Sequence, residues 1–389
     1  MIERKIQNKI VNALKNFRVV IVSGPRQAGK TTLVKAIAKE LGLSYYTFDD
    51  SEILVTAQNH PKDFIKFISK NRSAIDEVQY LPEIIPAIKM VVDEKNKRGM
   101  FLLTGSSDIQ RMSSVKESLV GRMVGLELYP LSTVEIEQRE TNIIDLLFSD
   151  DIFLLDLSVY NGSIEYLTEK LLEGGYPEII GFDEENRRMW YDAYVEYRII
   201  KDAKDFESIN ANKAQSITML LKLLATQVSS LISFNRLSKK LKIADKTVAK
   251  YISILEAMYI VKLIEPYFNN RGNRLTKAKK VHFIDTGLVA NLLHADRSIL
   301  VNKGEIYGNL VESFVFTELL KQSTFSKNRV SIYHYRDTKQ REVDFVLELA
   351  NGDIVGIEVK SGNTIKAQDT KGMVSLAEHA KEKFLSVFP

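Results

Sequence analysis

The chain has 389 residues, of which 45% are hydrophobic, and a formal net charge of +4, values that suit a globular protein of two to four domains. It contains no cysteine, which excludes disulfide bonds and cysteine-ligated zinc and agrees with a reducing cytoplasm. The N-terminal stretch has no apolar signal-peptide core and no apolar run approaches the roughly 20 residues of a membrane helix, so we expect a soluble cytoplasmic protein with no membrane partner.

The first predicted element with chemical meaning is a β-branched strand at residues 19–22, followed by a glycine-bearing loop and a helix over residues 31–41. The loop matches G-x-x-x-x-G-K-[ST], the phosphate-binding pattern, and its place between a strand and a helix argues against a chance match in an ordinary turn. Gly24 and Gly29 allow backbone N–H groups to turn toward phosphate oxygens. The expected nucleotide-binding residues of this loop are Gly24, Pro25, Arg26, Gln27, Ala28, Gly29, Lys30, Thr31 and Thr32.

Two residues of this loop have distinct expected roles. Lys30 reaches the β- and γ-phosphates and acts as a catalytic group, and Thr31 ligates Mg²⁺. Further along, a short predicted strand at residues 73–75 runs into an acidic pair. We expect Asp76 to hold Mg²⁺ through water and Glu77 to polarise the attacking water as the general base. The sequence therefore predicts a protein that binds ATP and Mg²⁺.

A further buried strand is predicted at residues 100–103, and it ends in a small polar segment. Ser106, with Thr104 as the alternate, is expected to sense the γ-phosphate, although Thr-Gly-Ser is also ordinary turn chemistry. Arg111 and Arg122 are both candidates for an arginine finger that acts on the nucleotide of its own or of a neighbouring subunit, and a solvated surface arginine is the alternative for each.

The alternation of strands and helices predicts a mainly parallel sheet with helices on both faces. Residues 1 to about 200 resemble the prokaryotic AAA-type ATPases, in which GPRQxGKTTL, IDEVQ and LLTGSS recur in this order, and those strings stand here at residues 24–33, 75–79 and 102–107. The Gly-Gly-aromatic-Pro-Glu element of that family matches residues 174–178. The resemblance implies that the acidic strand lies beside the phosphate-loop strand. It also implies a homo-oligomer, because arginine fingers from a neighbouring subunit are common in this class.

The middle of the chain is predicted to be helical from residue 131 to 200 and to contain a winged helix-turn-helix in residues 213–268, which this stretch resembles. A helix over residues 246–258 would enter the DNA major groove. Residues 234–280 hold twelve Lys and Arg and three acidic residues, so this stretch carries +9 and the rest of the chain −5. Such asymmetry indicates a surface for a polyanion, with DNA the first candidate, although winged helices also serve as protein-docking modules.

The C-terminal region holds a second chemical signal in two predicted strands, residues 342–349 and 354–360. They carry the Asp…Glu-x-Lys signature of the PD-(D/E)xK nuclease fold, which this region resembles, at Asp344, Glu358 and Lys360. The two carboxylates would bind a second Mg²⁺ or Mn²⁺ that activates water, and the lysine would orient that water. Glu312, on the preceding predicted helix, would complete the acidic cluster, and Gln368 would contact phosphate.

The register of this hairpin is an internal test of the metal site. A two-residue loop at Asn351 and Gly352 would place Asp344 opposite Val359, on the wrong face. A three-residue loop with Gly352 in a left-handed bulge places Asp344 directly across from Glu358. We therefore predict the bulged loop. The fold also looks short, since only one strand is expected after the signature.

The predicted architecture is α/β: a P-loop NTPase parallel sheet sandwich, a helical connector with a winged helix, and a small α/β PD-(D/E)xK nuclease-like domain. The expected boundaries are residues 1–140, 141–210, 211–295 and 296–389. The first functional hypothesis is a Mg²⁺-dependent ATPase that acts on DNA, coupled to metal-dependent cleavage. The second is an ATP-switched docking protein whose nuclease-like domain is inactive. The expected catalytic residues are Lys30, Glu77, Arg111, Arg122, Asp344, Glu358 and Lys360, and the expected metal ligands are Thr31, Asp76, Glu312, Asp344 and Glu358.

Overall fold

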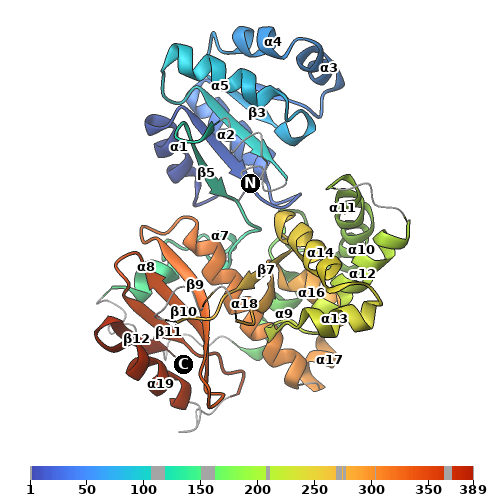
Figure 1. Cartoon of the computed structure of the whole chain (residues 1–389), viewed down its shortest axis with the longest axis vertical. Helices are drawn as coiled ribbons and strands as arrows, with labels where there is room; N and C mark the ends of the chain where they lie inside the picture. Colours follow the sequence, from blue (N-terminus) through green and yellow to red (C-terminus); the bar gives the residue numbers. More distant parts are fainter. Residues whose placement is uncertain are drawn as a thin grey trace. The chain divides into compact units, whose positions relative to one another are not determined.

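The computed structural model describes residues 2–106, 119–149, 163–206, 211–268, 274, 277–302, 304–362 and 370–388 (Figure 1). The chain divides into two compact units. Unit 1 is Met1–Leu131 with Ala257–Tyr259, and unit 2 is Ser132–Glu256 with Ile260–Pro389. The expected connector, winged-helix and C-terminal regions therefore fall mainly in unit 2. In the described part of the chain, no helix combines the length and the apolar character that crossing a bilayer requires.

Unit 1 alternates strands and helices as the sequence predicted. Its strands are β1 (Val19–Ser23), β2 (Ser44–Thr47), β3 (Ser73–Asp76), β4 (Phe101–Gly105) and β5 (Met123–Glu127). Its helices are α1 (Gln7–Asn16), α2 (Lys30–Leu41), α3 (Ser51–Asn59), α4 (Pro61–Ile68), the 3₁₀ turn η1 (Val78–Tyr80) and α5 (Ile84–Lys95).

The five strands form one parallel sheet in the order β2-β3-β4-β1-β5. The expectation that the acidic strand lies beside the phosphate-loop strand is wrong, because β4 is inserted between β3 and β1. Neighbouring strands lie only about 4.8 Å apart, so side chains at the carboxyl ends of β3 and β1 still meet across β4. The insertion also places the end of β4, with Thr104 and Ser106, between the phosphate loop and the acidic pair.

Both faces of this sheet are covered. Val19 and Ile21 of β1 join one apolar core with residues of α4 and α5, whereas Val20 and Val22 point to the opposite face and are equally buried. Strands buried on both faces read as continuous apolar runs, which is why VVIV was recognisable as a strand. The sheet is thus a rigid layer whose carboxyl edge carries the loops.

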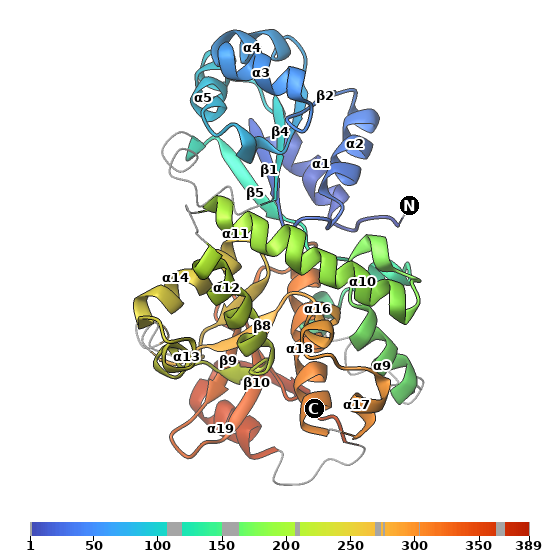
Figure 2. The same ribbon diagram turned by 90° about the vertical axis from the view of Figure 1, so that its right-hand side faces the viewer.

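Unit 2 begins with helices. They are α7 (Thr133–Ile136), α8 (Ile143–Leu147), α9 (Ile164–Glu173), α10 (Glu184–Tyr194), a π-helical turn η6 (Val195–Ile199), α11 (Ile200–Phe206) and α12 (Ala211–Ala225), with a 3₁₀ turn η5 (Pro177–Ile179) after α9. Helices α10 and α11 follow each other through η6 as one long rod (Figure 2). In α10, Trp190 stacks on Tyr194 with ring centroids 5.0 Å apart, so these aromatics pack against each other.

The next part of unit 2 is a small helical and three-stranded arrangement. It consists of α12, β6 (Ser230–Leu231), α13 (Phe234–Leu241), α14 (Asp245–Ala257), β7 (Val261–Ile264) and β8 (Lys280–Phe283), with the sheet order β6-β8-β7. Ser233 caps α13 by accepting from the Arg236 N–H, and Lys242 ends that helix in a left-handed conformation. The inner face of α14 is buried and includes Val248, Tyr251, Ile252 and Leu255.

The C-terminal part of unit 2 is a four-stranded sheet in the order β12-β11-β10-β9. Its elements, with the helices that precede it, are α16 (Thr286–Leu292), α17 (Arg297–Asn302), α18 (Gly304–Ser323), β9 (Val330–Arg336), β10 (Glu342–Leu349), β11 (Ile354–Ile357), α19 (Lys371–Ala380), the 3₁₀ turn η8 (Lys381–Lys383) and β12 (Phe384–Phe388). The strands β9, β10 and β11 pair antiparallel, and β12 is parallel to β11.

The turn between β9 and β10 contains a carboxylate, Asp337, whose lowered pKa makes the stability of this part of the fold depend on pH. Burial opposes ionisation of Asp337, but donors from the Arg341 N–H at 2.9 Å, the Ser375 hydroxyl at 2.8 Å and the Arg341 guanidinium outweigh it and lower its pKa to about 2. A lowered carboxyl pKa stabilises the fold above the unfolded value near pH 4, and this stabilisation is lost as the pH falls toward 2.

We therefore expect Asp337→Asn to lower the free energy of unfolding by about 1–2 kcal/mol at pH 7, a range reduced for screening of the Arg341 ion pair. The difference from the unmodified chain should vanish near pH 2. Urea unfolding at both pH values measures it, and an equal loss at pH 2 and pH 7 would show that the ionised carboxylate is not the cause.

Candidate functional site

The loop between β1 and α2 has the backbone shape that a phosphate cradle requires. Gln27 and Gly29 both have left-handed φ angles, 61° and 90°, and α2 begins directly afterwards at Lys30. Gly24 has no room for a side chain, because a Cβ there would lie 2.0 Å from the Leu128 carbonyl oxygen. Glycine is therefore required at position 24 by the close backbone approach and favoured at position 29 by the left-handed φ. The loop ends at a helix N-terminus, where anions are favoured.

The cradle is held from behind by a residue that sequence reasoning missed. Arg4 is buried, and its guanidinium donates to the carbonyl oxygens of Ala28 at 2.7 Å and Tyr129 at 2.6 Å. The Lys30 ammonium donates to the carbonyls of Gly24 at 3.0 Å and Pro25 at 2.7 Å, so it lies over the loop. Of the remaining loop residues, Ala28 is buried, and Thr32 is exposed on the first turn of α2.

The acidic strand end meets the loop. The Thr31 hydroxyl donates to Asp76 Oδ2 at 2.7 Å, the Tyr45 hydroxyl donates to the same oxygen at 2.8 Å, and the Thr104 hydroxyl donates to Asp76 Oδ1. Burial and then the Asp76 carboxylate raise the pKa of Tyr45 above its usual value, so the phenol keeps its proton. Mg²⁺ prefers oxygen ligands such as hydroxyl and carboxylate groups. The adjacent side-chain oxygens of Thr31 and Asp76 therefore fit the expected ion.

The expected general base is held by a second missed residue. Glu77 has a left-handed φ of 59°, and its N–H donates to Thr104 Oγ1 at 3.1 Å. The Gln79 side-chain amide donates to the Glu77 carboxylate and to Ser106 Oγ, the latter at 3.0 Å, and its oxygen accepts from the Ser106 N–H. Gln79 therefore links the expected base to the expected γ-phosphate sensor. Gln79 is the last residue of the IDEVQ string, so the sequence motif could have indicated a role for it.

The two arginine candidates are not brought to the loop. Arg111 lies outside the described residues. Arg122 precedes β5, and β5 pairs with β1 in parallel, Val19 opposite Met123, so Arg122 lies at the amino edge of the sheet. The phosphate loop is at the carboxyl edge, roughly 16 Å away at 3.3 Å per residue. Arg122 instead forms a two-point ion pair with Asp93, at 2.5 and 2.8 Å. A role for Arg122 on the nucleotide of its own subunit is therefore wrong.

In unit 2, the hairpin register predicted for the nuclease-like signature is confirmed. Phe345 pairs with Ile357 and Glu348 with Ile354, the register of the three-residue loop, and Gly352 has a φ of 93°. The same register places Asp344 across from Glu358, and the Val359 N–H donates to Asp344 Oδ2 at 2.9 Å. On its other side, the β10–β9 pairing shifts between Val343 and Val346, so Asp344 lies at a bulge.

A lysine from the basic stretch 234–280 lies between two of the expected metal ligands, Glu312 and Asp344. Lys280 Nζ donates to Glu312 Oε1 at 2.7 Å and to Asp344 Oδ1 at 3.1 Å. Burial alone would lower the pKa of Lys280, but the two carboxylates raise it above its usual value. Among the described residues, no three His, Asp or Glu side chains come together to hold a metal ion. The expected cluster of Glu312, Asp344 and Glu358 therefore does not fit a divalent cation as arranged.

The rest of this cluster is buried and incompletely paired. Glu358 Oε1 accepts from the Lys360 ammonium at 2.7 Å, and Glu358 Oε2 has no hydrogen-bond partner among the described residues. Burial and the Asp344 charge raise the pKa of Glu358 to about 7. His282 Nε2 is also without a hydrogen-bond partner and lies 3.9 Å from Glu312 Oε1, and burial lowers the pKa of His282 well below its usual value. Gln368 lies outside the described residues.

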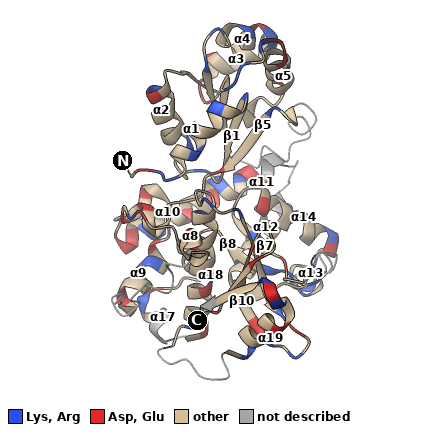
Figure 3. Ribbon diagram, turned by 90° about the vertical axis from the view of Figure 1, so that its left-hand side faces the viewer, with Lys and Arg blue, Asp and Glu red and all other residues tan. Residues whose placement is uncertain are grey.

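Nine of the twelve basic residues in the stretch 234–280, Lys280 among them, fall into two sets; Lys262 and the exposed Lys277 belong to neither, and Arg271 lies outside the described residues. Near β7 and β8 the charges are paired with acids: Arg274 makes two bonds to Glu348, at 2.6 and 3.1 Å, and Lys279 pairs with Glu265 at 2.9 Å. The segment that follows β7 also pairs with β9, since the Tyr267 N–H donates to the His334 carbonyl. The exposed set lies on α13, α14 and the turn between them, and consists of Arg236, Lys239, Lys240, Lys242, Lys246 and Lys250 (Figure 3).

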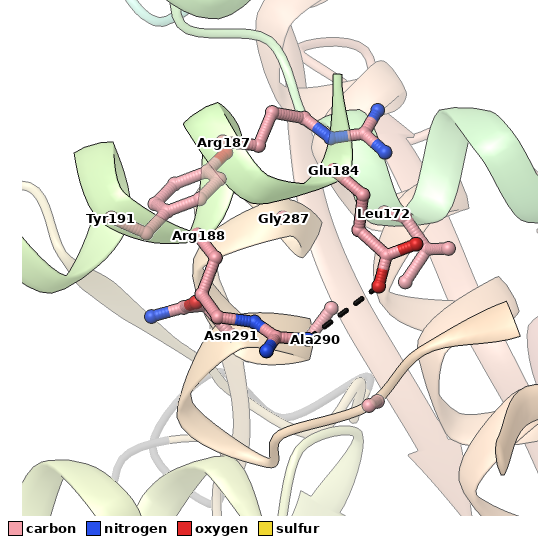
Figure 4. A pocket seen from close by; sticks show the side chains of 9 residues that line it. Leu172, Glu184, Arg187, Arg188, Tyr191, Gly287, Ala290 and Asn291 are labelled. Atoms are coloured by element: carbon pink, nitrogen blue, oxygen red, sulfur yellow. Dashed lines mark hydrogen bonds and ion pairs between the residues drawn. The ribbon is translucent and has the colours of Figure 1, made fainter. Parts of the chain in front are cut away.

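The Gly-Gly-Tyr-Pro-Glu segment has a structural explanation. Gly174 has a φ of 73° and a Cβ there would lie 2.3 Å from the Tyr191 hydroxyl. The Gly175 N–H donates to Asp285 Oδ2 at 2.7 Å. A small pocket of about 40 Å³ lies beside this junction, between α10 and α16, with Glu184 and Arg188 paired at its rim (Figure 4). It holds about one water and is too small for a nucleotide.

The folded loop, its acidic partner strand and the parallel sheet form a P-loop ATPase-like domain, and residues 16–137 match the family model described as an AAA domain. Two further models, both described as domains of unknown function, match residues 164–298 (DUF8612) and 307–388 (DUF4143). The chain is 27% identical over 369 residues to the uncharacterized proteins Mb2031c of Mycobacterium bovis and Rv2008c of Mycobacterium tuberculosis, covering 94% of this chain and 75% of each relative.

Two solved structures are similar at low scores. The Walker-type ATPase PABY2304 of Pyrococcus abyssi is 15% identical with a TM-score of 0.44, covering 75% of this chain and 96% of that one. AMPPCP-bound DnaA from Aquifex aeolicus is 18% identical with a TM-score of 0.30, covering 65% of this chain and 86% of that one. Neither score supports a functional argument, so the assignment to the ATPase class depends on the AAA model and the loop.

Proposed function

We propose that this chain is a Mg²⁺-dependent ATPase that acts on DNA. The observation that carries the first half is the pair of contacts across the carboxyl edge of the sheet. Thr31 meets Asp76 at 2.7 Å, and Gln79 joins Glu77 to Ser106. Every group that ATP hydrolysis needs, except an arginine finger, is thereby gathered on one rigid edge. A homo-oligomer would supply that finger from a neighbouring subunit, through Arg111 or Arg122.

Each residue has a defined part in this reaction. Lys30 and the N–H groups of the loop bind and orient the phosphates, and Thr31 with Asp76 holds Mg²⁺, which neutralises charge on the β- and γ-phosphate oxygens. Glu77 accepts the proton of the attacking water. Gln79 is a positioning residue, because it holds the Glu77 carboxylate and the Ser106 hydroxyl in one hydrogen-bonded line.

The second half of the proposal, action on DNA, has its support in the exposed basic set on α13 and α14. Helices α12, α13 and α14 with β6, β7 and β8 have the element order expected of a winged helix-turn-helix, whose last helix enters the major groove. Between β7 and the start of β8, Arg274, Lys279 and Lys280 pair with acids, so no phosphate contacts are assigned to these three residues. The helix-turn-helix face would supply the proposed phosphate contacts.

We expect the triple change Lys239→Gln, Lys240→Gln and Lys246→Gln to weaken DNA binding and to lower the slope of log affinity against log salt by about 3, about one for each phosphate contact. The matched control is the change to Gln of Lys62 and Lys66 on α4 and of Lys70 in the turn that follows it, which removes the same charge from another set of exposed lysines. Fluorescence anisotropy with a duplex over a salt series measures both. An unchanged slope in the first variant would remove this face from the proposal.

For the C-terminal region, the position of Lys280 favours the docking hypothesis over cleavage. The carboxylates that would carry a metal already hold an ammonium, and a nuclease of this type needs the metal to activate its water. We therefore propose that the nuclease-like domain serves as a docking domain and does not cleave DNA. The test is incubation of supercoiled and branched DNA with the full chain in Mg²⁺ or Mn²⁺. Nicking that Asp344→Asn abolishes would overturn the non-cleaving role and restore the nuclease hypothesis.

A further inference from the structure

The Lys280–Glu312–Asp344 arrangement brings together three separate parts of unit 2. Lys280 is the first residue of β8, Glu312 lies on α18, and Asp344 lies at the bulge of β10. The side chains of the three residues are only 7%, 13% and 11% exposed. The ammonium contacts one oxygen of each carboxylate, which is the bridging position that a small cation takes between two acids.

Two buried polar atoms around this triad are left without partners. Glu358 is 7% exposed, and its Oε2 has no hydrogen bond among the described residues. The fully buried imidazole of His282 has its Nε2 3.9 Å from Glu312 Oε1 and likewise unbonded. Buried polar atoms are paired in the great majority of cases, so unpaired ones around a bound cation indicate a ligand shell larger than the ammonium uses.

We propose that Lys280 is the built-in cation of this site, which replaces a divalent metal between Glu312 and Asp344, and that its removal leaves a site for Mn²⁺ or Mg²⁺. The inference rests on the proposed non-cleaving role of the domain. The Lys280 ammonium gives two of its three N–H donors to carboxylate oxygens at about 3 Å, and an ammonium does not ionise a water for attack as a divalent ion does. A divalent ion would need shorter bonds of about 2.0–2.2 Å and further oxygen ligands, which Glu358 would supply.

The competing interpretation is that Lys280 is an ordinary buried ion pair with no relation to metal binding. The two interpretations differ in what remains after the ammonium is removed. An ordinary pair leaves unpaired carboxylates that only destabilise the fold. If Lys280 replaces a metal, its removal leaves carboxylates that can bind a divalent ion. Added Mn²⁺ then restores the stability that the substitution removed.

The experiment compares the full chain with Lys280→Met, without nucleotide, by Mn²⁺ electron paramagnetic resonance and by thermal melting in a Mn²⁺ series. We expect Lys280→Met to bind one Mn²⁺ per chain more than the unmodified protein and to melt several degrees higher in Mn²⁺ than in chelator. The unmodified protein should show no such shift from this site. Equal Mn²⁺ binding by the two proteins would overturn the inference.

Three variants separate the outcomes. Lys277→Met removes an exposed lysine three positions earlier and should gain no Mn²⁺. Lys280→Met with Asp344→Asn should lose the gained ion. If Lys280→Met alone does not fold, Lys280→Met with Glu312→Gln leaves fewer unpaired charges, and folding that depends on Mn²⁺ would still support the inference, whereas indifference to Mn²⁺ would contradict it. DNA nicking is scored separately, so a bound metal without nicking leaves the non-cleaving role intact.

Discussion

The change Glu77→Gln is expected to reduce ATP turnover by about 10²–10⁴-fold while leaving ATP binding within a few-fold of the unmodified chain. Glutamine keeps the size of the side chain and its hydrogen bond with Gln79, but it cannot accept the proton of the attacking water. The phosphate contacts proposed for Lys30 and the loop are untouched, so the bound ground state is expected to remain.

The measurement is a steady-state phosphate-release assay beside a binding titration with a fluorescent ATP analogue. The matched control is Glu83→Gln, an exposed glutamate six positions later at the start of α5, which should keep full turnover. Lys30→Ala should lose binding and turnover together, because the cation that contacts the phosphates is gone. If Glu77→Gln turns over at the normal rate, the base assignment is wrong; if it loses binding, the residue holds the loop and not the water.

The sequence predicted local geometry well wherever one segment determines its own conformation. The strand–loop–helix at Gly24 to Lys30 follows from glycine spacing, and the β10–β11 register follows from side-chain alternation with a left-handed Gly352. In each case the residues that decide the structure are neighbours in the chain. Periodicity and turn chemistry therefore contain the information.

Contacts between distant segments were outside the reach of such reasoning. Arg4 meets Ala28 across 24 positions, and Lys280 meets Asp344 across 64 positions. The position of Arg122 at the amino edge depends on which strand pairs with β1. The prediction that β3 lies beside β1 was wrong for the same reason, because β4 lies between them. Lys280 also shows why a charge count overestimates a binding surface, since some lysines neutralise acids inside the fold.

The second large effect is expected from Asp285→Ala, which should lower the free energy of unfolding of unit 2 by about 3 kcal/mol or more. Asp285 is fully buried at the N-terminus of α16 and accepts three hydrogen bonds. They come from the Tyr191 hydroxyl at 2.6 Å, the Gly175 N–H at 2.7 Å and the Leu288 N–H at 3.0 Å. The Tyr191 hydroxyl keeps the Glu173 carbonyl as an acceptor at 3.1 Å, but the two buried N–H groups are left unpaired. Each buried donor left unpaired costs about 1–3 kcal/mol, so the two together exceed the loss of a single helix cap.

The same substitution at Asp296 is the matched control. Asp296 precedes α17 and accepts from the Ile299 N–H at 2.8 Å and the Ser298 hydroxyl at 2.6 Å, but its surroundings are open to water. Water satisfies the donors that Asp296→Ala exposes, so a much smaller loss is expected there. Chemical unfolding followed by the fluorescence of Trp190, which packs on Tyr191 with ring centroids 5.1 Å apart, reports on this junction. Equal losses for the two variants would mean that Asp285 acts only as a helix cap. A larger loss for Asp285→Ala would mean that the Gly174–Gly175 turn is held in place by a carboxylate 110 positions away.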